Sequence, residues 1–142
     1  MIGLIVKTDG SIEEFTYTGY PSLRDAVGGL IECVASARCP ETDLQYDLWG
    51  NEESRIRSRT DSNFKNNFVA QKITAHMTET PITGLLSLHG THVVLGVSDE
   101  GDSIGLSDYL LDTLKTLAVS PEEAKKHEDE YSEPFTQFRG FY

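Results

Sequence analysis

The sequence predicts a single α+β domain, in which a mainly antiparallel sheet carries a long amphipathic helix, followed by a helical C-terminal arm. Three observations support this prediction. The 142 residues suit one domain. An Asp9-Gly10 pair joins two β-rich runs, which is typical of a β-hairpin. Residues 23–37 repeat apolar side chains at helical spacing. We place the α+β domain at residues 1–118 and the arm at residues 119–142.

The hairpin opens the chain. Its first predicted strand, residues 2–8, is rich in isoleucine and valine. Its second, residues 11–19, places Phe15 and Tyr17 on one face because side chains alternate along a strand. We therefore expect one face of the hairpin to be buried.

A helix is predicted over residues 23–37, with Ser22 as its N-cap. Two adjacent glycines, Gly28 and Gly29, lie inside it, and each costs about 1 kcal/mol relative to alanine. Gly29 falls on the face opposite the apolar stripe. We therefore expect a sheet, a second subunit or a ligand to approach the helix backbone closely there.

A basic cluster follows a strand predicted at residues 43–54. In "RIRSR", Arg55, Arg57 and Arg59 occupy alternate positions. In an extended segment all three side chains would point to one side. They either form ion pairs with neighbouring carboxylates on a solvated face or bind an anionic ligand.

Three further elements complete the domain. Asn63 is the predicted N-cap of a helix over residues 64–77. This helix is apolar on two sides, which hints at a subunit contact on one of them. Residues 84–97 form the last predicted β region, and Ser107 is the predicted N-cap of a helix over residues 108–118.

The arm begins with a helix-start signal at Ser120-Pro121 and ends in an unusually aromatic tail. Chain termini are normally polar, so an aromatic tail predicts an anchor. The anchor docks either on its own domain or on a second copy. We favour the second copy, and therefore expect a homo-oligomer. The predicted self-association residues are Phe135, Phe138, Phe141 and Tyr142.

The charge and composition of the chain disfavour several classes of function. The chain has 23 acidic and 12 basic residues and a formal net charge of −11, which disfavours direct binding to a nucleic-acid backbone. This charge either serves solubility or lets the chain imitate nucleic acid in a partner's basic groove. No apolar run is long enough to span a membrane, and no signal peptide is evident. We expect a cytoplasmic protein without a membrane partner, in which Cys33 and Cys39 are reduced.

The sequence contains no catalytic or metal-binding constellation. His89 and His92 lie three apart, so in a strand they point to opposite faces. The acidic stretch at residues 99–102 lacks the alternating ligands of an EF-hand. Nucleophile-elbow, phosphate-loop and dinucleotide-binding motifs are missing. We therefore predict no catalytic residue, no metal site and no cofactor, and do not expect an enzyme.

Two motifs resemble a known family. "VGGLIE" at residues 27–32, and "DLWGNEESRI" at residues 47–56 followed by Asn63, are similar to the pattern of the family called domain of unknown function 3846. Ser54 departs from the glycine that the family pattern has at this point. The resemblance covers roughly residues 1–117. It implies a setting in phages, plasmids and bacteria, notably actinobacteria, but no activity.

Together, the residues and the resemblance predict a non-enzymatic accessory protein of a phage or mobile element. It would bind and neutralise a host factor in the host cytoplasm, either a defence component or a small anionic signalling nucleotide. One alternative is an acidic nucleic-acid mimic that inhibits a DNA-binding host protein. Another is a small enzyme that uses Glu32 and Glu52 as a carboxylate pair. The predicted ligand-binding residues are Gly28, Gly29, Glu32, Asn51, Glu52, Arg55, Arg57, Arg59 and Asn63.

Overall fold

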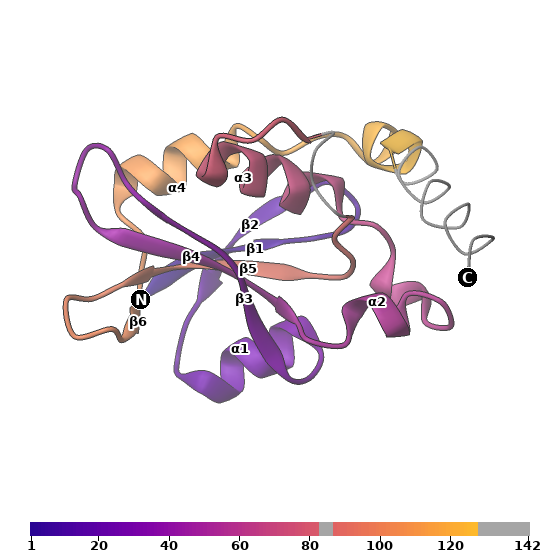
Figure 1. The fold of residues 1–142 in the computed structure, drawn as a ribbon, viewed down its shortest axis with the longest axis horizontal. Helices are drawn as coiled ribbons and strands as arrows, with labels where there is room; N and C mark the ends of the chain where they lie inside the picture. The colour runs from indigo at the N-terminus through magenta and orange to yellow at the C-terminus, as the bar shows by residue number, and fades with distance from the viewer. Residues whose placement is uncertain (83–86, 128–142) are drawn as a thin grey trace.

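The computed structural model describes residues 1–82 and 87–127, and it confirms the predicted α+β domain. Strands and helices follow one another along the chain without separating into two halves (Figure 1). In order, the elements are β1 (Ile2–Val6), β2 (Ile12–Thr16), α1 (Tyr20–Val27), β3 (Ile31–Arg38), β4 (Gln45–Asn51), α2 (Ser54–Arg57), the 3-10 turn η1 (Ser62–Phe64), α3 (Phe68–Thr78), β5 (His92–Val97), β6 (Ser103–Ile104) and α4 (Asp108–Lys115).

The strands form one antiparallel sheet in the order β2-β1-β5-β4-β3, and β6 pairs with the end of β5. Leu4 of β1 and Leu48 of β4 both pair with Val94 of β5, so these apolar side chains form a fully buried row across the centre. β5 begins at His92, so it occupies only the last part of the β region predicted at residues 84–97. The predicted hairpin is confirmed as β1 and β2.

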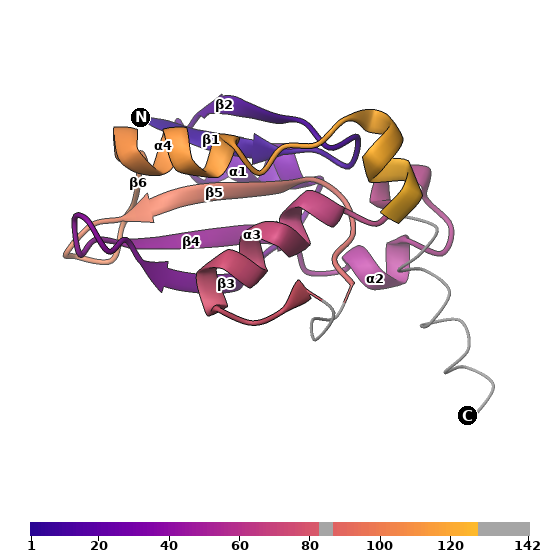
Figure 2. The same cartoon turned by 90° about the horizontal axis from the view of Figure 1, so that it is seen from above.

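Helices cover both faces of the sheet (Figures 1 and 2). α3 and α4 lie on one face, where Ile73 and Leu114 belong to the larger core cluster. α1 lies on the opposite face, where Leu23 and Val27 pack against Val93. Because side chains alternate along each strand, one sheet supplies apolar residues to both cores.

The prediction of one long helix over residues 23–37 is wrong, because this stretch contains the end of a helix followed by a strand. α1 ends at Val27, and β3 begins at Ile31. Gly28 closes the helix with a φ of 83°, and Gly29 follows with a φ of 152°. Glycine adopts such angles at no steric cost, so the pair ends the helix rather than weakening its middle. The residues after the two glycines form β3, which is hydrogen-bonded to β4 along its whole length. This strand pairing outweighs the helical spacing of their apolar side chains.

Two predicted N-caps are wrong and one is confirmed. α1 begins after Gly19, and Ser22 lies within its first turn. α3 begins after Asn67, which is fully buried and accepts a hydrogen bond from the helix. Asn63 instead lies in η1, four residues earlier. Ser107 caps α4 as predicted.

The first part of the arm packs on the domain. The Val119 N–H donates to the Gly10 carbonyl at 2.9 Å, and Ala124 is buried. The His127 ring stacks on the Phe68 ring with 3.7 Å between centroids. At Phe68, therefore, the second apolar side of α3 is covered by the same chain. The four aromatic residues of the tail lie outside the described residues, and their role in self-association stays a prediction.

Candidate functional site

A cleft of about 630 Å³ opens beside the C-terminal end of α1. Four segments that are distant in sequence form its walls: the turn of the β1–β2 hairpin, the end of α1, the chain from the end of α2 to just beyond η1, and Thr91 just before β5. The sheet brings the first two together, because the hairpin is part of it and α1 packs on it. The charged and amide side chains of the lining are Lys7, Asp9, Arg57, Asp61, Asn63 and Lys65.

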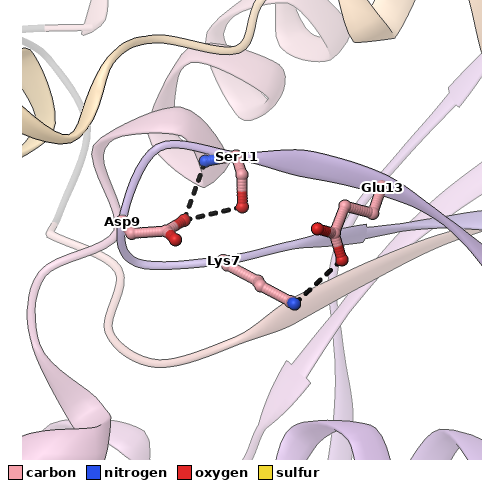
Figure 3. A network of polar contacts seen from close by, with 4 residues as sticks. All are labelled: Lys7, Asp9, Ser11 and Glu13. Carbon is pink, nitrogen blue, oxygen red and sulfur yellow. Dashed lines mark hydrogen bonds and ion pairs between the residues drawn. The ribbon is translucent and has the colours of Figure 1, made fainter.

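Lys7 and Asp9 line the cleft from the hairpin turn, and Figure 3 shows them with their polar partners. Asp9 Oδ1 accepts hydrogen bonds from the Ser11 hydroxyl at 2.6 Å and from the Ser11 N–H at 2.9 Å. These bonds lower the pKa of the Asp9 carboxyl. Lys7 Nζ lies 2.8 Å from Glu13 Oε2, and this hydrogen-bonded ion pair raises the pKa of Lys7. Lys7 and Asp9 are therefore both charged at neutral pH.

Arg57 is fixed from two sides on the facing wall. Its Nη1 donates to the Gly28 carbonyl at 2.9 Å, and its guanidinium carbon lies 4.8 Å from the centroid of the Phe64 ring. The Gly28 carbonyl belongs to the C-terminal end of α1, where the partial negative charge of a helix favours a cation. A cation over an aromatic ring adds about 0.5–1 kcal/mol. Arg57 thus lines the cleft as an oriented, planar cation.

Asp61 and Lys65, which precede and follow Phe64 in the sequence, also line the cleft. Asp61 Oδ1 accepts a hydrogen bond from the Asn63 N–H at 2.9 Å, which fixes the carboxylate at the start of η1. Its other oxygen has no hydrogen-bond partner among the residues that the structure describes. Lys65 is exposed, and within residues 1–82 and 87–127 it forms no ion pair. This wall therefore offers an acceptor and a cation to a ligand.

Asn51 and the glycine pair build the structure behind Arg57. Asn51 Nδ2 donates to the Val27 carbonyl at 3.2 Å, and its Oδ1 accepts from the Glu53 N–H at 2.7 Å. A Cβ on Gly29 would lie only 3.0 Å from Asn51 Nδ2. The backbone at Gly29 is thus approached closely by the chain's own Asn51, which joins the end of α1 to the end of β4.

Gly29→Ala is expected to destabilise the fold by about 2–3 kcal/mol, through backbone strain and displacement of Asn51. Gly101→Ala is the matched control. Gly101 also has a positive φ, of 89°, but a Cβ there would meet no described atom within 4 Å. The control should lose about 1 kcal/mol from strain alone. Urea denaturation of both variants measures the difference, and equal losses would contradict a tight contact at Asn51.

The nine predicted ligand-binding residues fall into three groups. Gly28, Arg57 and Asn63 line the cleft. Gly29 and Asn51 lie directly behind it and have structural contacts. The residues outside the lining are Glu32, Glu52, Arg55 and Arg59.

The arginine segment is helical, so the prediction that its three side chains share one side is wrong. α2 covers Ser54–Arg57, and positions two apart in a helix point in nearly opposite directions. Arg55 Nη2 accordingly donates to the Ser87 carbonyl at 3.2 Å, away from the cleft lining. Arg57 alone of the three lines the cleft.

Sequence reasoning missed four charged residues of the cleft: Lys7, Asp9, Asp61 and Lys65. Asp9 is recognisable in the sequence as a turn residue, but nothing in its neighbourhood relates it to a position 52 residues later. Only the sheet places the hairpin turn opposite η1. No local pattern could have revealed this convergence.

The cleft's chemistry suits binding. Its cations and carboxylates can hold a ligand that carries an anionic group together with hydrogen-bond donors. Within the described ranges, no three His, Cys, Asp or Glu residues gather where they could hold a metal ion. In the same ranges, the helices are too short or too polar for any of them to cross a membrane.

Residues 1–118 match the family described as domain of unknown function DUF3846. The match includes every wall of the cleft and ends just before the arm. No curated protein and no solved structure matches the chain.

Proposed function

The chain belongs to the DUF3846 family, and we propose that this member binds and sequesters a small anionic nucleotide without converting it. One observation supports this most directly. In a chain with a net charge of −11, three of the 12 lysines and arginines line a single cleft. The overall charge disfavours long polyanions, whereas a local group of cations selects a small anion. The cleft volume of about 630 Å³ is typical of small-molecule sites.

The three cations differ in how ready they are to bind. Arg57 is already oriented by the Gly28 carbonyl and the Phe64 ring. Binding a ligand therefore costs little conformational entropy at this side chain. Its planar guanidinium can donate hydrogen bonds to an acceptor of the nucleotide or stack on a base. Lys65 is exposed, and Lys7 shares its charge with Glu13. Arg57 is therefore the expected main contact.

The proposed role follows from where such binding would act. The family resemblance implies that such proteins occur in phages, plasmids and bacteria. In the cytoplasm of a host cell, a phage accessory protein that sequesters a signalling nucleotide would neutralise the defence response that this nucleotide triggers. Sequestration requires binding and no chemistry, which agrees with a cleft lined by cations and hydrogen-bond acceptors.

Arg57→Gln is expected to weaken nucleotide binding by at least about 10-fold, because it removes the guanidinium that bonds to or stacks on the nucleotide, a contact worth about 1–3 kcal/mol. Isothermal titration calorimetry with a panel of cyclic mononucleotides and dinucleotides measures this loss. Arg59→Gln is the matched control, because Arg59 lies two residues away, outside the lining. Its affinity should equal that of the wild type.

Two results would contradict the proposal. One is the absence of binding across the panel. The other is an equal affinity in the Arg57 and Arg59 variants. Thermal denaturation of each variant checks that its fold is intact, since Arg57 also bonds to Gly28. Chromatography of the nucleotide after incubation tests for conversion. A changed nucleotide would favour an enzyme, and Glu32→Gln and Glu52→Gln would then test the carboxylate pair.

A further inference from the structure

We infer that the ligand is a guanine nucleotide, with its base stacked on Arg57 and its edge hydrogen-bonded to Asp61. This inference rests on the proposed function and names the ligand class of the same cleft. Two features carry it: the mixed charge of the lining and the environment of the Arg57 guanidinium.

The mixed charge excludes ligands that are anionic throughout. Asp9 and Asp61 lie in the lining beside the three cations. Hydrogen bonds from Ser11 lower the pKa of Asp9, so this carboxyl stays ionised at neutral pH. A carboxylate repels phosphate and accepts hydrogen bonds. The ligand that fits carries an anionic group at one end and hydrogen-bond donors at the other, as a nucleoside monophosphate does.

Arg57 supplies the platform for a base. Its guanidinium carbon lies over the Phe64 ring, 4.8 Å from the centroid, and the residue lines the cleft. Guanidinium planes stack on aromatic rings and on nucleobases, with base stacking worth about 1–3 kcal/mol. A base in the cleft would lie on the opposite face from Phe64, which gives a stack of ring, guanidinium and base. Lys7 and Lys65 would then bind the phosphate group.

Asp61 selects guanine among the bases. The Watson–Crick edge of guanine presents two adjacent donors, the N1–H and the N2 amino group, which match the two oxygens of a carboxylate. Adenine presents one donor beside one acceptor, so one oxygen would face a lone pair. Asp61 lies four residues after Arg57, is held through its Oδ1 by the Asn63 N–H, and has an oxygen without a described partner. Its N–H also donates to the Arg57 carbonyl at 2.8 Å, and both residues line the cleft, so its carboxylate can accept from a base bound there.

The test compares guanosine and adenosine monophosphate by calorimetry in the wild type and in Asp61→Asn. We expect the wild type to bind the guanine nucleotide at least about 10-fold more tightly, because a site with fixed acceptors rejects an analogue that lacks the donor. Asparagine keeps the oxygen that accepts from the Asn63 N–H, but it presents one donor and one acceptor. The variant should therefore lose the guanine preference and gain affinity for the adenine nucleotide.

Asp112→Asn is the control, because it makes the same change at an exposed position of α4, outside the cleft lining. It should keep the wild-type preference. Equal affinity of the wild type for both nucleotides would overturn the guanine assignment while leaving the proposed function standing. A guanine preference that survives in Asp61→Asn would overturn the role of Asp61. Failure of these nucleotides and of the cyclic panel to bind at all would overturn both proposals.

Discussion

Asn67→Ala is expected to lower the free energy of unfolding by about 3–5 kcal/mol, because it leaves several buried groups without partners. Asn67 is fully buried. Its Nδ2 donates to the Gly90 carbonyl at 2.8 Å and to the Val6 carbonyl at 3.1 Å. Its Oδ1 accepts from the Ala70 N–H at 2.9 Å. One side chain therefore caps α3 and also joins that helix to β1 and to the segment before β5.

Asn63→Ala is the matched control for this prediction. Asn63 is exposed, and it contributes its backbone N–H to the hydrogen bond with Asp61, which alanine retains. It should lose less than about 0.5 kcal/mol. Urea denaturation of both variants, followed by circular dichroism, measures the two losses. Similar losses in the two variants would show that Asn67 does not hold the three elements together.

Acidification from pH 6.5 to pH 4 is expected to destabilise the protein by about 3 kcal/mol through His92 alone. His92 is buried on β5, with its Nδ1 2.9 Å from the Gly90 carbonyl. A Cβ on Gly50 would lie 2.8 Å from its Nε2, so the ring is enclosed on that side as well. Burial lowers the pKa of His92 from 6.5 to about 4, because the enclosed ring cannot be solvated as a cation.

The sign follows from proton uptake. Above pH 6.5 the imidazole is neutral in both states, and the stability is complete. As the pH falls, the unfolded chain takes up a proton at its ordinary pKa, which the folded chain accepts only near pH 4. Unfolding is therefore favoured progressively between these values, and the loss from this residue levels off below pH 4.

His92→Asn isolates this contribution, because the amide can still donate to the Gly90 carbonyl but does not titrate. The variant should show a flatter dependence of unfolding free energy on pH between 6.5 and 4 than the wild type. His76→Gln, which removes an exposed histidine, should keep the wild-type dependence. Denaturant titrations at several pH values provide the comparison. A wild-type slope in His92→Asn would rule out His92 as the source of acid sensitivity.

The family and several local structures could be predicted from the sequence. Asp9-Gly10 predicts the hairpin because a tight turn depends on the residues that occupy it. Ser107 predicts the start of α4 because an N-cap bonds to the turn that follows it. The motif around Gly28 and Asn51 identified the family that covers residues 1–118. These features have their causes within a few residues of the chain, or in the motif itself.

The site could be predicted only in part. Arg57 was predicted as an anion contact together with Arg55, on the assumption that the segment is extended. The segment is instead helical, and Arg55 bonds to the Ser87 carbonyl outside the cleft lining. Asn51 was predicted as a ligand contact, and in the structure its amide is bonded to the Val27 carbonyl and the Glu53 N–H. A motif marks such residues without distinguishing a role in binding from a role in the fold.

The sequence by itself determined the fold class, the hairpin, the cap of α4 and the charge that disfavours polyanions. The tertiary structure decided the end of α1, the cap of α3 and the cleft. Residues after Gly29 have helical spacing, and only pairing with β4 makes them a strand. Asn63 and Asn67 are both acceptable caps, but only Asn67 also reaches two carbonyl groups of the core. The cleft brings together Asp9 and Asp61, whose proximity comes from the sheet. Local preferences differ by about 1 kcal/mol or less, whereas burial and long-range hydrogen bonds together contribute several kcal/mol, so the tertiary contacts prevail.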